Sequence, residues 1–169
     1  MKTAGVILAI ALALVLQTTL TRFIVRGTVA VDLVLVVVVY VALSSGSVTG
    51  LLAGTFAGLI QDSLSTGVIG IGGLAKTLVG FLSGIIGTQF IVARPLPRFV
   101  VFFAATVLHQ AVTIGLGVLL GLRSFGNPYA AVAGRALGNA VVGVTAFQLV
   151  ELLPGAVERR RTARSRLRR

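Results

Sequence analysis

The segment that decides the fold runs from Gly50 to Gly87 and reads GLLAGTFAGLIQDSLSTGVIGIGGLAKTLVGFLSGIIG. It is apolar and glycine-rich, but it carries one amide, one carboxylate and one ammonium, at Gln61, Asp62 and Lys76. Charged groups at membrane depth are costly, so they usually face other parts of the protein. On a helix with about 100° per residue, one arc of about 80° holds Gly73, Lys76, Gly80, Gly84 and Gly87. The lysine therefore projects from a face that another helix can approach closely.

The composition of the whole chain indicates a membrane protein. Hydrophobic residues make up 56% of the 169 residues and charged residues only 11%, and the mean hydropathy is +1.04. A soluble domain carries roughly a quarter charged residues. Cysteine is absent, which excludes disulfides and thiolate metal sites.

The net charge of +11 is concentrated at the C-terminal end, where RRRTARSRLRR at 159–169 holds seven of the fifteen basic residues. No aromatic residue is interleaved with these arginines to stack on bases. The position after a hydrophobic segment favours a cytoplasmic anchor on anionic lipid. We therefore expect no nucleic-acid binding, and docking of the tail on a cytoplasmic filament stays open.

Turn-forming and charged residues divide the apolar sequence into six segments. The breaks lie at Arg22–Gly27, Ser44–Gly46, Asp62–Gly67, Arg94–Arg98, Arg123–Tyr129 and Pro154–Gly155. Proline cannot continue a helix, so Pro95 and Pro97 predict a loop. The pattern predicts an all-α polytopic bundle of six transmembrane helices, at 3–21, 29–43, 47–61, 70–92, 99–121 and 131–153. We assign 1–155 to this domain and 156–169 to the cytoplasmic tail.

The basic residues predict the orientation. With the N-terminus in the cytoplasm, ten lie on cytoplasmic segments, namely Lys2, Arg94, Arg98 and the seven tail arginines, against Arg22, Arg26 and Arg123 outside. This asymmetry favours both termini in the cytoplasm.

The same topology places two acids and two bases at a shared depth in the outer half of the bundle, namely Asp32, Asp62, Lys76 and Arg135. Pairing offsets part of the cost of burying each charge. The alternative is that the two basic side chains reach the external headgroups separately. For Lys76 the glycine-lined face favours pairing, whereas for Arg135 both alternatives stay open.

Small residues recur at four-residue steps, a spacing that lets helix backbones approach closely in membranes. The third segment has Gly50, Gly54 and Gly58, and similar pairs occur at Gly80/Gly84 and Gly134/Gly138. Tight internal packing is the favoured interpretation, and an intermolecular contact is the alternative.

No motif predicts catalysis or a cofactor. Ser63 and Ser65 precede Lys76, but no oxyanion loop or nucleophile elbow surrounds them. His109 shares a helix face with Thr106, Gln110, Thr113 and Gly117. A lone histidine in a membrane helix can relay protons or bind metal, but a hydrogen-bonding face between helices fits this pattern better.

Several motifs within residues 32–87 resemble those of the rod shape-determining protein MreD family. They are the Asp32–Leu43 segment, the Gly50/Gly54/Gly58 series ending in Gly58-Leu59-Ile60-Gln61-Asp62, and Leu74-Ala75-Lys76-Thr77. The family shows a similar Gly-Leu-x-Gln-Asp turn followed by a Lys-Thr helix. It usually has proline before the aspartate, where this chain has Val31.

The resemblance implies a non-enzymatic membrane subunit of the bacterial elongation complex. Such proteins associate with MreC, and together they connect the MreB filament with RodA and its partner, a class B penicillin-binding protein. The family is also thought to resemble the substrate-binding subunits of energy-coupling-factor transporters in fold. The alternative function is therefore a substrate-capture subunit of a vitamin-type transporter, with Asp62, Lys76 and Arg135 lining an outward-facing pocket.

Overall fold

The computed structural model describes residues 3–23, 31–65, 68–89, 94–122 and 129–166, and within these ranges all regular structure is helical. The helices are α1 (Thr3–Phe23), α2 (Leu33–Ser45), α3 (Ser47–Ser63), α4 (Ile71–Gln89), α5 (Pro95–Leu119) and α6 (Tyr129–Arg166). The all-α prediction is confirmed. The predicted breaks at 24–27, 66–67 and 123–128, and the end of the tail at 167–169, lie outside the described residues.

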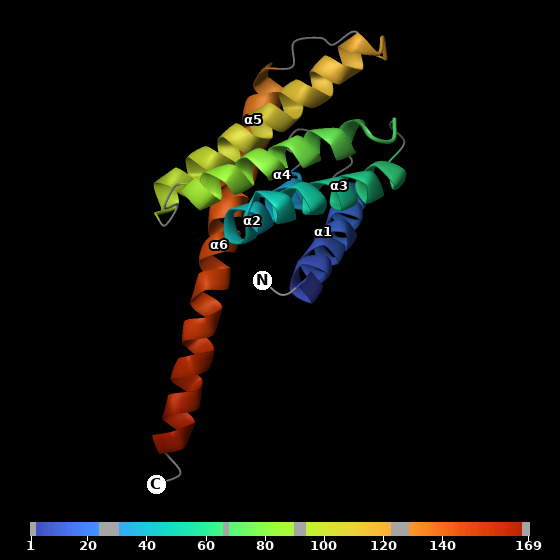
Figure 1. Cartoon of the computed structure of the whole chain (residues 1–169). Helices are drawn as coiled ribbons and strands as arrows, with labels where there is room; N and C mark the ends of the chain where they lie inside the picture. The colour runs from blue at the N-terminus through green and yellow to red at the C-terminus, as the bar shows by residue number, and fades with distance from the viewer. Residues whose placement is uncertain (1–2, 24–30, 66–67, 90–93, 123–128, 167–169) are drawn as a thin grey trace.

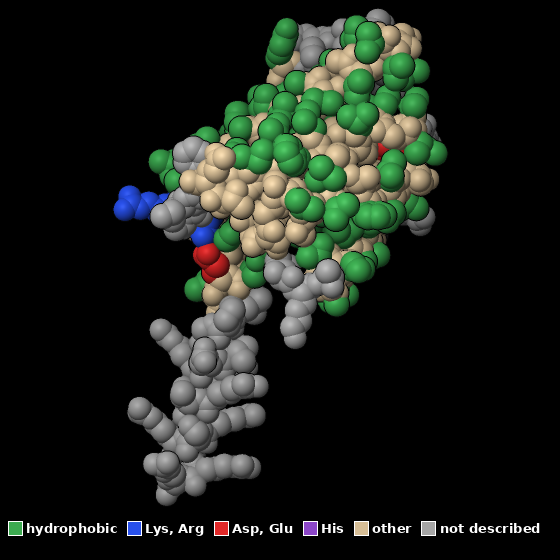
Figure 2. Space-filling model, viewed as in Figure 1, with side chains coloured by type: hydrophobic (Ala, Val, Ile, Leu, Met, Phe, Trp, Pro, Cys, Tyr) green, Lys and Arg blue, Asp and Glu red, His purple; other side chains and the backbone are tan. Residues whose placement is uncertain are grey.

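Three helices in the described part of the chain are long and apolar enough to cross a membrane: α4, α5 and the Tyr129–Leu152 part of α6. Ala4–Thr19 and Leu33–Ser45 are shorter apolar helices. Six complete spans therefore remain a prediction. Large apolar side chains such as Leu8, Phe56 and Leu119 are exposed, and green apolar side chains cover much of the face in Figure 2. Such an apolar exterior suits contact with lipid.

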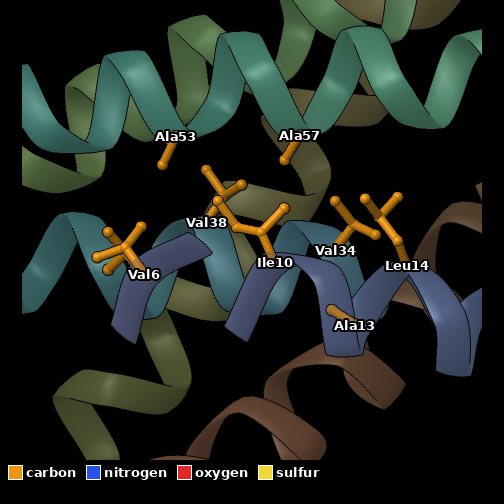
Figure 3. Close-up of a cluster of buried hydrophobic side chains, with 9 residues drawn as sticks. Val6, Ile10, Ala13, Leu14, Val34, Val38, Ala53 and Ala57 are labelled. Carbon is orange, nitrogen blue, oxygen red and sulfur yellow. The ribbon is translucent and has the colours of Figure 1, made fainter. Parts of the chain in front are cut away.

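Helix α2 lies at the centre of the bundle. Its buried residues occur on all sides, from Val34 to Ala42, as expected for a helix that is apolar all round. One side packs in a core with Val6 and Ile10 of α1 and with Ala57 of α3, and Figure 3 shows these side chains converging. The opposite side packs against α4, α5 and α6 in a second core that includes Phe102.

Gly46 makes the predicted turn between α2 and α3 almost alone. It is the C-cap of α2 and the N-cap of α3, with φ +91°. Residues with side chains rarely adopt this left-handed conformation. The turn folds the two helices into a hairpin, and Figure 1 shows α2 and α3 beside α4.

The structure corrects two predicted helix ends. Residues 94–98 are not a loop, because α5 begins at Pro95 with Arg94 as its N-cap. Proline is tolerated in the first turn of a helix, where its missing N–H has no intrahelical partner. Nor does Pro154 end the last helix. Helix α6 continues to Arg166, and in Figure 1 its C-terminal part projects away from the other helices.

Candidate functional site

The glycine series of α3 packs directly on the backbone of α4. A Cβ added at Gly50 would overlap the carbonyl oxygen of Gly80, and one added at Gly54 would overlap that of Lys76. A Cβ on Gly58 would lie 2.6 Å from the Cα of Gly73. The structure thus places this small-residue face inside the α3–α4 hairpin. Gly84 extends the contact to Ser47 at the start of α3.

Two hydroxyls lie within this glycine-lined interface. Thr55 Oγ1 and Thr77 Oγ1 are 2.8 Å apart, and the Thr77 hydroxyl lies 2.7 Å from the Gly73 carbonyl. The absence of side chains at the glycines is what lets two short threonine side chains meet across the helices.

Asp62 ties the end of α3 to the start of α4. One of its carboxylate oxygens, Oδ2, accepts hydrogen bonds from the backbone N–H groups of Gly70 and Gly73, each at 2.9 Å. A carboxylate at a helix N-terminus satisfies donors that have no intrahelical acceptor. The signature Gln61-Asp62 pair therefore contributes a backbone-capping group to this connection.

The acid partner of Lys76 is Asp32. The Lys76 ammonium is buried and lies 3.0 Å from Asp32 Oδ2. It also lies 3.2 Å from Nε2 of His109, so the imidazole accepts this hydrogen bond when its proton is on Nδ1. Asp32 begins α2 as its N-cap, and its other oxygen accepts the Leu35 N–H at 2.9 Å. Three helices, α2, α4 and α5, meet at this lysine.

Asn139 joins α6 to the same group of side chains. Its Oδ1 accepts the Asp32 backbone N–H at 2.8 Å, and its Nδ2 donates to Thr106 Oγ1 at 3.2 Å. The side chain is only 1% exposed. We call Asp32, Lys76, Thr106, His109 and Asn139 the Lys76 cluster.

Gln17 brings α1 to the start of α2. Its amide nitrogen donates to the Val31 carbonyl at 3.0 Å, and its amide oxygen accepts the Leu33 N–H at 2.9 Å. With this contact, α1, α2, α4, α5 and α6 each supply a polar side chain at the Lys76 cluster or beside the start of α2.

Arg135 is exposed, and among the described residues no acid lies within ion-pair distance of it. Its side chain lines a cavity of about 610 Å³ together with Asp32, Gln61, Asp62 and Lys76. An adjoining chamber of about 180 Å³ is lined by Gln17, His109 and Asn139 and shares Gln61 and Arg135 with the cavity. Within the described ranges, no group of three or more His, Asp or Glu residues is placed to hold a metal ion.

A second charged group joins the start of α5 to the part of α6 that follows Asn139. Arg98, 4% exposed, makes two hydrogen bonds to Glu151, at 2.8 and 2.6 Å. Its guanidinium carbon lies 3.9 Å from the centre of the Phe147 ring, which packs edge-on against Tyr40 at 4.8 Å. This Arg98 cluster (Tyr40, Arg98, Phe147 and Glu151) is about 17 Å along α5 from His109, at 1.5 Å per residue.

Sequence reasoning missed Asn139 and the Arg98 cluster. Arg98 counted only as a charge that sets topology, and Glu151 carried no role. The available signals were Asn139, an amide in the middle of the last apolar span, and Glu151, an acid near the end of that span. Polar groups at such positions usually find partners on neighbouring helices.

An all-helical bundle with an apolar exterior and buried polar groups that link its helices defines an integral membrane protein. The chain matches the family model described as rod shape-determining protein MreD over residues 1–153, and it therefore belongs to the MreD family. Members of this family are structural membrane proteins of cell-shape determination. No curated protein and no solved structure matches the chain, so the expected likeness to energy-coupling-factor subunits stays a prediction.

Proposed function

We propose that this chain is a non-enzymatic subunit of the bacterial rod complex in the inner membrane, with both termini in the cytoplasm. It binds MreC and, through it, helps to organise lateral peptidoglycan synthesis by RodA and a class B penicillin-binding protein. The family match over residues 1–153 carries this proposal. The distribution of basic residues supports the orientation.

The partner helix needs a surface that internal packing leaves available. The glycine face of α3 is occupied by α4, so it does not serve this purpose. An apolar groove of about 540 Å³ runs between α1 and α3, and its lining includes Ile7, Leu52 and Phe56. These side chains are 68%, 50% and 63% exposed. We assign this groove to the single membrane-spanning helix of MreC, because a groove lets such a helix pack against side chains of both α1 and α3, and packing is what holds helices together in a membrane.

Site-specific photo-crosslinking in native membranes tests this assignment. A photoreactive residue at Leu52 or Phe56 is expected to capture MreC. One at Leu96 or Val100, which are at least 56% exposed on α5, is expected to capture little. Crosslinks only from α5 would move the interface away from the groove. Failure to recover MreC by any crosslink or by affinity capture would contradict the proposed function.

The tail and the transporter alternative are tested in the same membranes. Affinity capture with residues 156–169 deleted shows whether the tail contributes contact with MreB, since loss of MreB and retention of MreC would assign that role to it. A substrate-capture subunit would instead be stabilised by a soluble vitamin and would not recover MreC.

A further inference from the structure

The cavity that holds Arg135 opens at one end of the bundle. Its lining includes Ser65 and Val68, between α3 and α4, and Leu122, after α5. Its volume of about 610 Å³ lies within the range of about 300–1,000 Å³ that is usual for small-molecule sites. The cavity is thus large enough for a ligand and lies beside the Lys76 cluster.

The charged side chains that line the cavity are equal in number for the two signs. Its described lining holds two acids, Asp32 and Asp62, and two bases, Lys76 and Arg135. Lys76 is paired with Asp32, and Asp62 accepts two backbone N–H groups. Arg135 is the lining cation that no described acid pairs. A ligand with both a negative and a positive group preserves this balance, while a simple anion does not.

Gln61, one of the residues that line the same cavity, carries an acceptor without a donor. The Oε1 atom of Gln61 is buried, and no described group donates a hydrogen bond to it. A buried acceptor left in this state costs free energy that a ligand donor recovers. The carboxylate of the neighbouring Asp62 adds negative charge on the same wall. This wall is therefore suited to an ammonium group.

We propose that the cavity binds a phosphoethanolamine group. The guanidinium of Arg135 pairs with the phosphate, since its planar set of donors matches phosphate oxygens. The ammonium lies beside Asp62, and rotation of the Gln61 side chain turns Oε1 into the cavity to accept a hydrogen bond from it. Val68 and Leu122 at the cavity edge are 50% and 46% exposed and apolar. They give hydrocarbon attached to the phosphate a surface to follow, as in phosphatidylethanolamine.

Thermal unfolding of the full chain in detergent, with lipid added, tests the proposal. Phosphatidylethanolamine is expected to raise the melting temperature more than phosphatidylcholine, which has the same phosphate but no N–H donor. Free phosphoethanolamine is the third arm: stabilisation by it alone assigns the site to a soluble ligand, and stabilisation only by the lipid assigns it to a headgroup. Equal effects of the two lipids, or a larger effect of anionic phosphatidylglycerol, would overturn the proposal.

Two variants connect the effect to the cavity. Arg135→Gln is expected to weaken phosphatidylethanolamine binding, measured by native mass spectrometry, about tenfold or more, as for loss of a charge-assisted hydrogen bond. Arg94→Gln, at an exposed arginine that does not line the cavity, is the matched control and is expected to bind normally. Unchanged binding by the Arg135 variant would overturn the proposal.

Gln61→Leu separates a ligand role from a structural one. It removes an acceptor that has no described donor, so the lipid-free protein is expected to melt at the same temperature or higher. The preference for phosphatidylethanolamine over phosphatidylcholine is expected to disappear. If the preference persists at full size, the ammonium is not held by Gln61 and this part of the proposal fails.

Discussion

The two helix pairs α3–α4 and α5–α6 are held together in different ways. In α3–α4 the backbones touch. Gly50 and Gly54 of α3 each lie against a backbone carbonyl of α4, and Gly58 lies against the Cα of Gly73. In α5–α6 side chains fill the space: Phe102 packs on Gly143 and Arg98 binds Glu151. Contact through glycines tolerates no added atom, whereas contact through long side chains can adjust.

The difference extends to the two charged clusters. Lys76 and Asp32 are mostly buried, with side chains 4% and 20% exposed, whereas Glu151 is 53% exposed. A buried ion pair becomes costly when one partner is lost, because the other charge remains without compensation. In the Arg98 pair the guanidinium is also buried, at 5% exposed, but Glu151 reaches solvent. Water can therefore enter where a lost carboxylate lay, and the loss is smaller. We therefore expect a larger loss of stability from a variant that breaks the Lys76–Asp32 pair than from one that breaks the Arg98–Glu151 pair.

The largest effect is expected from Lys76→Met, which cuts the ion pair between α4 and α2. It leaves the Asp32 carboxylate buried without its cation, a loss of about 3–5 kcal/mol. Thermal unfolding in detergent and accumulation in the membrane measure it. Adding Asp32→Asn is expected to restore much of the stability, because asparagine still caps α2 without a charge. Strictly additive losses in the double variant would mean that the two residues are not coupled.

The next largest effect is expected from a variant that disrupts the backbone contact between α3 and α4. Gly54→Leu would force a side chain into the Lys76 backbone, and overpacking of this kind costs about 1–3 kcal/mol or more. Gly134→Leu is the matched control, because a Cβ there meets nothing within 4 Å. We expect lower membrane accumulation and a lower melting temperature only for the first variant. Equal behaviour of the two would show that α3 and α4 are not in backbone contact.

The sequence predicted the helical hairpin and the position of Lys76 because both depend on local spacing. Glycines at four-residue steps share a helix face wherever the helix lies. The same spacing at Gly134/Gly138 gave the same expectation, yet Gly134 is not packed against a neighbour. Which small-residue face is used depends on the partner helix, and spacing within one helix does not specify it.

The partners of the polar residues were harder to predict. Asp32 was expected at the same level as Lys76, and the two lie 3.0 Å apart, but the choice of Asp32 as the partner and the role of Asn139 require the lateral order of α2, α4 and α6. Helix ends were misjudged where proline was read only as a terminator, since Pro95 begins α5 and Pro154 lies within α6. These features depend on tertiary packing and on where a proline falls within the helix.

The smallest effect is expected in the α5–α6 pair, from Glu151→Gln. Glutamine can still accept one hydrogen bond from Arg98, and the Phe147 ring 3.9 Å from the guanidinium carbon remains. Because Glu151 reaches solvent and the amide oxygen still accepts from Arg98, the loss of stability should be clearly smaller than that of Lys76→Met. This loss of stability should also be smaller at high salt, because salt screens exposed charges. Melting temperatures at low and high salt measure this, with Lys76→Met measured alongside. A salt-independent loss as large as that of Lys76→Met would show that both clusters are equally shielded and would remove the distinction between the two helix pairs.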